Sequence, residues 1–293
     1  MNIRTQIGHF YQPGTNAVFR SISASSITST EFSGDGSFLT SINEIINVKN
    51  KPFSAKGDGS TNDTIAIQAA FDSVPSSGGI IYFPSGTYLI SAALTVKSKT
   101  FITGVNQWTS SIKLSNSANV NMFNLINVSS ILFNNLQLDG NRNNQGVGTS
   151  KSLNLSGCSN IFVENCRIIN SAAHAIYVID SITGLYIKNN TLKSAYLANA
   201  NSPLMMIEHP LGSGTSQDIF IQNNLIDQTE VHSSCMKLFF FNDDSTTNTS
   251  STIKVNNVLI QNNIVKIGWA GVGVTTTGIE LWGNNGTIFT GLI

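Results

Sequence analysis

The fold is decided by an eight-residue motif that occurs five times: ILFNNLQL at 131–138, IFVENCRI at 161–168, LYIKNNTL at 185–192, IFIQNNLI at 219–226 and VLIQNNIV at 258–265. In each copy two apolar residues alternate with variable residues, an Asn follows, and an aliphatic residue returns three positions later. Alternation with a period of two is typical of a β-strand. A unit that recurs in this way indicates a repeat architecture.

The copies begin 30, 24, 34 and 39 residues apart, and weaker copies flank them at 100–104 and 287–291. We expect a second short strand before most copies, at 152–157, 175–180, 204–209, 236–241 and 278–283. Each unit then contains two or three short strands, and the turns absorb the differences in length. The regular leucine spacing of leucine-rich repeats is absent. The pattern therefore predicts an all-β fold, a right-handed parallel β-helix, whose handedness follows from the rule for parallel crossovers.

Equivalent positions of successive coils in a β-helix stack about 4.8 Å apart. We therefore expect the Asn that follows the alternating residues to form an internal ladder, in which each amide bonds to the next coil and to turn backbone. Asn also tolerates the left-handed backbone conformation that a tight bend requires. The predicted ladder consists of Asn135, Asn165, Asn189, Asn223 and Asn262.

Residues 57–90 follow a different pattern. Asn62 or Asp63 is a suitable helix N-cap, and Ile67, Phe71 and Val74 follow at helical spacing. We expect this short amphipathic helix to cap the open end of the β-helix, which would otherwise expose apolar side chains and unpaired backbone. The sequence thus predicts a β-helix domain over 51–293, with coils over 100–293, and a separate N-terminal attachment or trimerisation segment over 1–50.

The run AKGDGSTNDTIAIQAAFDSVPSSGGIIYFPSGTYLI at 55–90, together with the Asn-bearing coils, resembles the pectate-lyase-like β-helix superfamily. That superfamily includes polygalacturonase-like enzymes and phage tailspikes, and the resemblance covers about residues 50–293. It implies the fold more specifically than the activity, because this fold serves lyases, hydrolases, epimerases and binding proteins. Residues 1–50 are rich in Ser and Thr, carry GDGS at 34–37, and resemble the linker segments of phage tail fibres and tailspikes.

The composition excludes several classes of protein. Asn, Ser and Thr make up 98 of the 293 residues, only 11% are charged, and the formal net charge is zero. A nucleic-acid partner would require an excess of basic residues, and this sequence has none. No apolar run reaches the roughly 20 residues that span a bilayer, and no apolar signal-peptide region is visible at the N-terminus. The spacing of Cys158, Cys166 and Cys235 matches no metal site, so we expect buried reduced thiols and neither metal nor cofactor.

Polysaccharide chemistry requires carboxylates, or a base and a positive group, on one outer face of the coil. The loops of the longest units bracket the strands at 204–209 and 236–241 and bring acidic residues together. We therefore predict catalytic roles for Glu208, His209, Asp243 and Asp244. Residues on neighbouring coils are predicted to bind substrate: Tyr177, Lys237, Glu280 and Trp282. In the alternative interpretation, Asp243 and Asp244 simply begin a polar loop and His209 ends a strand.

The resemblance implies three hypotheses. In the first, the chain is a subunit of a homotrimeric phage tailspike or tail fibre that binds, and in one version degrades, a host-surface polysaccharide. It would assemble in the host cytoplasm and join other virion tail proteins through its N-terminal segment. The second hypothesis is a secreted, extracellular polysaccharide lyase or glycoside hydrolase, and the third is a structural spacer. The sequence leaves enzymatic activity open, because Arg142 and Arg167, the only arginines of the coils, lie far from the acidic cluster.

Overall fold

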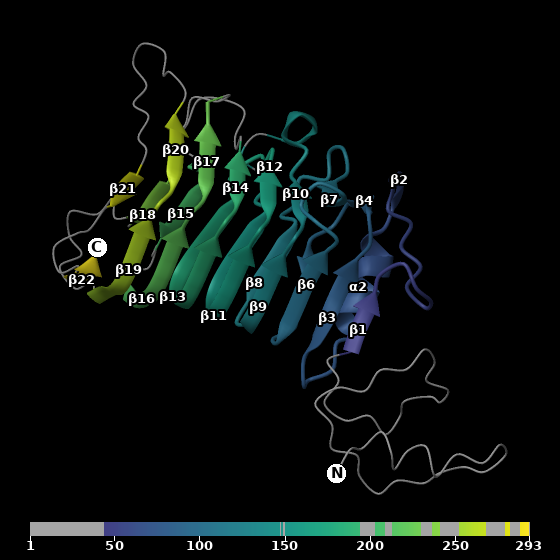
Figure 1. The fold of residues 1–293 in the computed structure, drawn as a ribbon, viewed down its shortest axis with the longest axis horizontal. Helices are drawn as coiled ribbons and strands as arrows, with labels where there is room; N and C mark the ends of the chain where they lie inside the picture. The colour runs from purple at the N-terminus through teal and green to yellow at the C-terminus, as the bar shows by residue number, and fades with distance from the viewer. Residues whose placement is uncertain are drawn as a thin grey trace, which may run out of the picture. The chain divides into compact units, whose positions relative to one another are not determined.

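A computed structural model of the chain describes residues 44–146, 148, 150–193, 203–208, 213–229, 236–240, 252–267, 279–281 and 288–292. It confirms the predicted parallel β-helix: every paired strand runs parallel to its neighbours. Figure 1 shows successive coils stacked side by side from β1 to β22. The coils present three outer faces, of which faces 1 and 2 form one continuous 14-stranded sheet and face 3 an 8-stranded sheet.

The strands divide among the faces as follows. Face 1 contains β5 (Leu94–Thr95), β8 (Phe123–Ile126), the first parts of β11 (Leu153–Glu164) and β13 (Ile176–Lys188), β15 (Met205–Glu208), β18 (Met236–Phe240) and β21 (Ile279–Leu281). Face 2 contains β1 (Glu44–Asn47), β3 (Gly79–Phe83), β6 (Thr100–Gly104), β9 (Ser129–Asn134), the second parts of β11 and β13, β16 (Ser213–Gln222), β19 (Thr252–Gln261) and β22 (Ile288–Leu292). Face 3 contains β2 (Asp58–Asn62), β4 (Gly86–Ile90), β7 (Ser110–Leu114), β10 (Gln137–Asp139), β12 (Arg167–Ile169), β14 (Thr191–Lys193), β17 (Leu225–Gln228) and β20 (Ile264–Ile267).

The first apolar residue of each motif points into the coil. These residues pair in register from β9 to β19, and all are almost completely buried: Ile131, Ile161, Leu185, Ile219 and Val258. Alternation along each strand therefore separates an apolar interior from an outer surface. The core is one continuous column of aliphatic and aromatic side chains.

The predicted Asn ladder is wrong by one position. Asn135, Asn165, Asn189, Asn223 and Asn262 all adopt the left-handed conformation, with φ between 53° and 58°. They form the bend, as their residue type allows, but the bend turns the next residue inward. The ladder is therefore made by the residues that follow the last three of them, the buried Asn190 and Asn224 and the partly buried Asn263. Leu136 and Cys166 occupy the equivalent buried positions of earlier coils.

The predicted cap helix is present as α2 (Thr64–Asp72), with Asp63 as its N-cap residue. Ile67, Phe71 and Val74 are buried, and the Phe71 ring packs edge-on against Phe123 at 6.0 Å between centroids. Asp63 does not cap the helix with its side chain; its carboxylate accepts hydrogen bonds from the backbone N–H groups of Lys56 and Gly57. The helix thus covers the first coil and ties down the loop before it.

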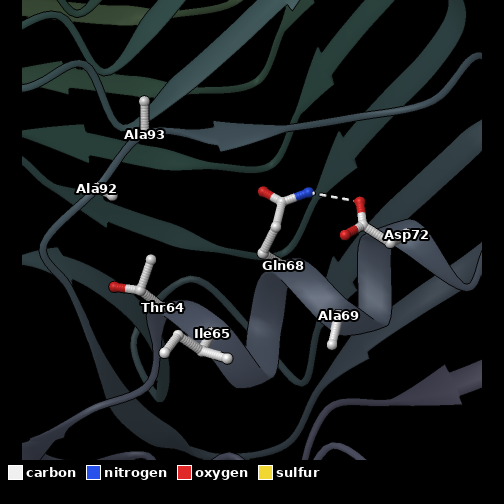
Figure 2. A pocket seen from close by; sticks show the side chains of 7 residues that line it. All are labelled: Thr64, Ile65, Gln68, Ala69, Asp72, Ala92 and Ala93. Atoms are coloured by element: carbon white, nitrogen blue, oxygen red, sulfur yellow. Dashed lines mark hydrogen bonds between the residues drawn. The ribbon is translucent and has the colours of Figure 1, made fainter.

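A shallow hollow of about 350 Å³ lies along the outer side of α2. Figure 2 shows its lining, in which Gln68 donates a hydrogen bond to Asp72 beside the small side chains of Ala92 and Ala93. Gln68 also bonds to the backbone of Thr95, so its polar groups join α2 to β5. The hollow offers no pair of acids or bases for chemistry.

Three further sequence predictions can be compared with the described residues. β1 pairs with β3, so the first coil already includes residues before the predicted boundary at 51. Cys158 and Cys166 are buried free thiols, as predicted, whereas Cys235 lies outside the described residues. Among the residues that the structure describes, no helix is long and apolar enough to cross a bilayer.

Candidate functional site

The predicted substrate-binding residues Tyr177, Lys237 and Glu280 occupy one column of face 1. Tyr177 pairs in register with Met206, Met206 with Lys237, and Lys237 with Glu280. The backbone therefore places Tyr177, Met206, Lys237 and Glu280 on four successive coils, with Met206 between Tyr177 and Lys237. The side chains of Lys237 and Glu280 are not among those described. Four predicted site residues lie outside the described residues altogether: His209, Asp243, Asp244 and Trp282.

Glu208 is the one predicted catalytic residue that the structure describes, and it contacts a predicted binding residue. The Tyr177 hydroxyl donates a hydrogen bond to the Glu208 carboxylate, from β13 to β15. Two further side chains complete the group: His174 stacks on the Tyr177 ring at 5.1 Å, and the Lys151 ammonium lies 3.9 Å from the centre of that ring. We call Lys151, His174, Tyr177 and Glu208 the face-1 cluster.

The turns before three face-1 strands bring this cluster together. Lys151, His174 and Pro203 each lie two residues before the first residues of β11, β13 and β15, which pair in register. His174 Nδ1 lies 2.7 Å from the Pro203 carbonyl oxygen in the next coil. Because a carbonyl oxygen only accepts hydrogen bonds, Nδ1 carries the proton, and Nε2 of a neutral His174 is left as a base.

Burial controls the protonation of the cluster. Burial lowers the pKa of His174 to about 4, so this imidazole is neutral at pH 7. Burial, followed by the hydrogen bond to Glu208, raises the pKa of Tyr177 far above its ordinary value, so the phenol keeps its proton. Burial also lowers the pKa of Lys151, while the negative charge of Glu208 opposes that shift. The cluster therefore combines a neutral base, a phenolic proton donor and a partly desolvated cation.

The Tyr177 ring is only 8% exposed, because its neighbours already cover much of it. The Tyr177 ring therefore presents little surface on which a sugar ring could stack. Its polar contribution is the hydroxyl group, which is held against Glu208. Glu208 and Lys151 are both partly exposed, so solvent reaches the charged part of the cluster.

A column of amides continues face 1 beyond the cluster. Asn124 and Asn154 pair in register with each other, and Asn154 with Tyr177. The side-chain oxygen of Asn124 accepts hydrogen bonds from the side-chain amides of Asn121 at 2.9 Å and Asn154 at 3.2 Å. These side chains are partly exposed. Neutral amides next to a charged cluster suit hydrogen bonding to hydroxyl groups.

The sequence pattern does not single out Lys151, and it leaves His174 as either a groove residue or a turn histidine. Aligning the segments KSLNLSG and HAIYVID by their strands would have placed the two residues near each other on neighbouring coils. What the alignment could not supply is their burial, which sets the protonation state of each.

In chemical terms, the described cluster contains the kinds of group that proton transfer requires. Glycoside hydrolysis requires two carboxyl groups about 5–9.5 Å apart, and the predicted partners of Glu208 lie outside the described residues. Removal of a proton next to a sugar carboxylate requires a base, a proton donor and a positive group, and His174, Tyr177 and Lys151 provide these three types of group.

A three-faced parallel β-helix with a helix over its first coil and a polar cluster on one outer face defines the class of pectate-lyase-like β-helix proteins. The chain belongs to the rhamnogalacturonase A/epimerase, pectate lyase-like family, whose model matches residues 45–289. This confirms the superfamily that the motifs at 55–90 and in the coils predicted.

Two kinds of curated relatives match parts of the chain. The pre-neck appendage protein of Bacillus phage phi29 is 31% identical over 140 residues, which cover 43% of this chain and 16% of that protein. Mannuronan C5-epimerase AlgE3 of Azotobacter vinelandii is 36% identical over 108 residues, which cover 32% of this chain and 6% of that protein. The chain therefore spans only a small part of the length of these relatives.

Two solved structures share the fold. PfbA, a surface adhesin of Streptococcus pneumoniae, aligns with a TM-score of 0.56 and 20% identity over 84% of this chain and 62% of its own. ORF18 of Geobacillus virus E2 aligns with a TM-score of 0.50 and 19% identity over 75% of this chain and 48% of its own. At this identity the likeness concerns the fold alone.

Proposed function

We propose that this chain is a subunit of a phage tailspike or tail fibre that binds a host-surface polysaccharide along face 1. The observation that carries the proposal is the face-1 cluster with its adjoining amides. Asn121, Asn124 and Asn154 provide donors and acceptors for sugar hydroxyls, and Lys151 provides a positive charge for acidic sugars. The similarity to a phage pre-neck appendage protein supports the virion setting.

The proposed assembly is a homotrimer in the virion tail, formed in the host cytoplasm and joined to other tail proteins through the N-terminal segment. A long, low-charge exterior rich in Asn, Ser and Thr suits contacts with glycans and with neighbouring subunits. The alternatives are a secreted extracellular enzyme and a structural spacer, and the binding experiment below distinguishes the spacer from both.

A second candidate function is elimination or C5 epimerisation of a uronate-containing polymer, which the types of side chain in the cluster favour. In elimination, neutral His174 takes the C5 proton, the C–H electrons form the C4–C5 double bond, and the O4 leaving group departs with a proton from Tyr177. Lys151 balances the negative charge on the uronate carboxylate. The similarity to a mannuronan C5-epimerase supports this chemistry. A hydrolase would instead pair Glu208 with Asp243 or Asp244.

The test incubates the whole chain with capsular polysaccharide, lipopolysaccharide, alginate and polygalacturonate. Co-sedimentation reports binding, new reducing ends report cleavage, and unsaturated uronate products report elimination. We expect binding to at least one acidic polymer. Absence of binding to every polymer would favour the spacer, and an activity that survives both Glu208→Gln and Asp243→Asn would overturn the predicted acid–base pair. An activity lost in His174→Gln but retained in Asp243→Asn would favour elimination or epimerisation.

A further inference from the structure

A continuous apolar stripe runs along the outer side of face 2, away from the face-1 cluster. Its members pair in register from one coil to the next: Ile45, Ile80, Phe101, Leu132, Phe162, Tyr186, Phe220 and Leu259. Ile45 is 66% exposed and Phe101 39%, and the others are partly exposed. With steps of about 4.8 Å, the stripe is roughly 34 Å long. Scattered apolar residues are ordinary on a surface, but a continuous patch marks a contact site.

The stripe is not built to hold sugars. Phe162 and Tyr186 stack with centroids 4.5 Å apart and planes 6° from parallel, and Tyr186 and Phe220 stack at 5.1 Å and 5°. Sugar rings pack on the faces of aromatic rings, and here much of those faces is covered by the neighbouring rings. What remains toward solvent is a row of ring edges and aliphatic groups, which matches another apolar protein surface.

Face 3 provides an internal comparison on the same coils. One of its outer columns carries alternating charges over successive coils: Lys113, Asp139, Lys193, Asp227 and Lys266, interrupted by Ile169. Lys113 and Asp139 lie 4.0 Å apart as an ion pair. Although only 11% of the residues of this chain are charged, face 3 carries a column of charged side chains. Face 3 thus carries charged side chains in a column of the same coils where face 2 carries the apolar stripe, and this difference supports a role for the stripe as a contact surface.

The columns beside the stripe indicate what covers it. One of them is Tyr82, Thr103, Asn134, Glu164, Lys188, Gln222 and Gln261, and the other is Ser129, Ser159, Thr183, Gln217 and Asn256. Hydroxyls and amides both donate and accept hydrogen bonds, so they complement an identical surface. The two charged members, Glu164 and Lys188, have opposite signs and pair in register, so their charges offset one another within one coil step.

We infer that the apolar stripe of face 2 is the surface on which a second copy of this chain packs. The inference rests on the homo-oligomer proposed above and names the surface that forms it. Copies placed with their stripes together bury apolar side chains, match amides with amides and bring no excess of like charge into contact. Face 1 stays open to a ligand in this arrangement, because the cluster lies on a different face of the coil.

The test compares two substitutions in the same coil of the whole chain. Tyr186→Asp places a charge in the stripe, and Thr191→Asp places the same charge at an outward position of face 3. Sedimentation velocity over a concentration series should show an oligomer for the wild type and for Thr191→Asp. For Tyr186→Asp we expect at least about tenfold weaker association, as for central aromatic residues of interfaces. Tyr186→Leu, which keeps the apolar contact, should assemble.

Circular dichroism and thermal unfolding establish that each variant is folded. If Tyr186→Asp does not fold, Phe101→Asp, which lies in the stripe several coils away, replaces it as the test variant. A monomeric wild type, or an oligomer unaffected by both Asp substitutions in the stripe, would overturn the inference. Polysaccharide binding is measured separately on the monomeric variant. A wild type that binds polysaccharide but stays monomeric would overturn the inference alone. A wild type that assembles through face 2 but binds no polysaccharide would overturn only the proposed function.

Discussion

The side-chain oxygen of Asn224 accepts two hydrogen bonds from Asn190, one coil earlier: from its backbone N–H at 2.9 Å and from its side-chain amide at 3.1 Å. Asn224 in turn donates from both of its nitrogens to the side-chain oxygen of Asn263, at 3.0 Å and 2.9 Å. These amides satisfy buried backbone groups that the bend removes from the sheet. The ladder therefore stabilises the stacking of the coils at their polar corner.

Asn224→Ala should lower the free energy of unfolding by about 3 kcal/mol, because it leaves the Asn190 N–H and the Ile187 carbonyl without their partner. The neighbouring Asn223 is exposed and has a φ of 58°, so Asn223→Gly should change stability little. Urea unfolding of both variants measures the difference. Equal losses at the two positions would show that the ladder assignment is wrong.

The ladder also shows how far the sequence could predict the structure. The repeat predicted the coil because inward residues such as Ile161 and Leu185 recur at every turn of the chain. It could not indicate which of two adjacent Asn residues points inward, because strict alternation selects Asn189. The left-handed bend at Asn189 breaks that alternation and directs Asn190 into the core.

The site was predictable to a similar extent. Strand alignment placed Tyr177 and Glu208 on adjacent coils, and the structure joins them by a hydrogen bond. The contributions of Lys151 and His174 depend on how two turns pack, and on burial, which residue spacing does not contain.

Acidification should destabilise the fold through His174. Burial lowers the pKa of this residue from 6.5 to about 4, so between these values the unfolded chain binds a proton that the folded chain does not. Stability is therefore complete above about pH 6.5 and falls toward pH 4, by about 3 kcal/mol in all. In His174→Asn, whose amide can still donate to the Pro203 carbonyl, the melting temperature should depend less on pH over this range. Parallel pH profiles for the two proteins would contradict this assignment.

The thiols of Cys158 and Cys166 should not react in the folded protein. Burial raises the pKa of the Cys166 thiol to about 12 and also raises that of Cys158, so neither forms the reactive thiolate. A Cys235→Ser variant leaves these two thiols alone in the chain. Maleimide labelling followed by mass spectrometry should detect two reactive thiols only after denaturation. Rapid labelling under native conditions would show that the coil opens near the labelled cysteine.

The most direct test of glycan binding on face 1 is the affinity of matched variants for a polysaccharide that the wild type binds. Lys151→Gln and Glu208→Gln remove charges from the face-1 cluster, whereas Lys113→Gln removes one from face 3. Because hydrogen bonds to charged groups contribute about 1.5–3 kcal/mol, each face-1 variant should bind roughly tenfold or more weakly. Lys113→Gln should bind like the wild type. Equal affinity of all four proteins, or an equal loss in Lys113→Gln, would contradict a polysaccharide site on face 1.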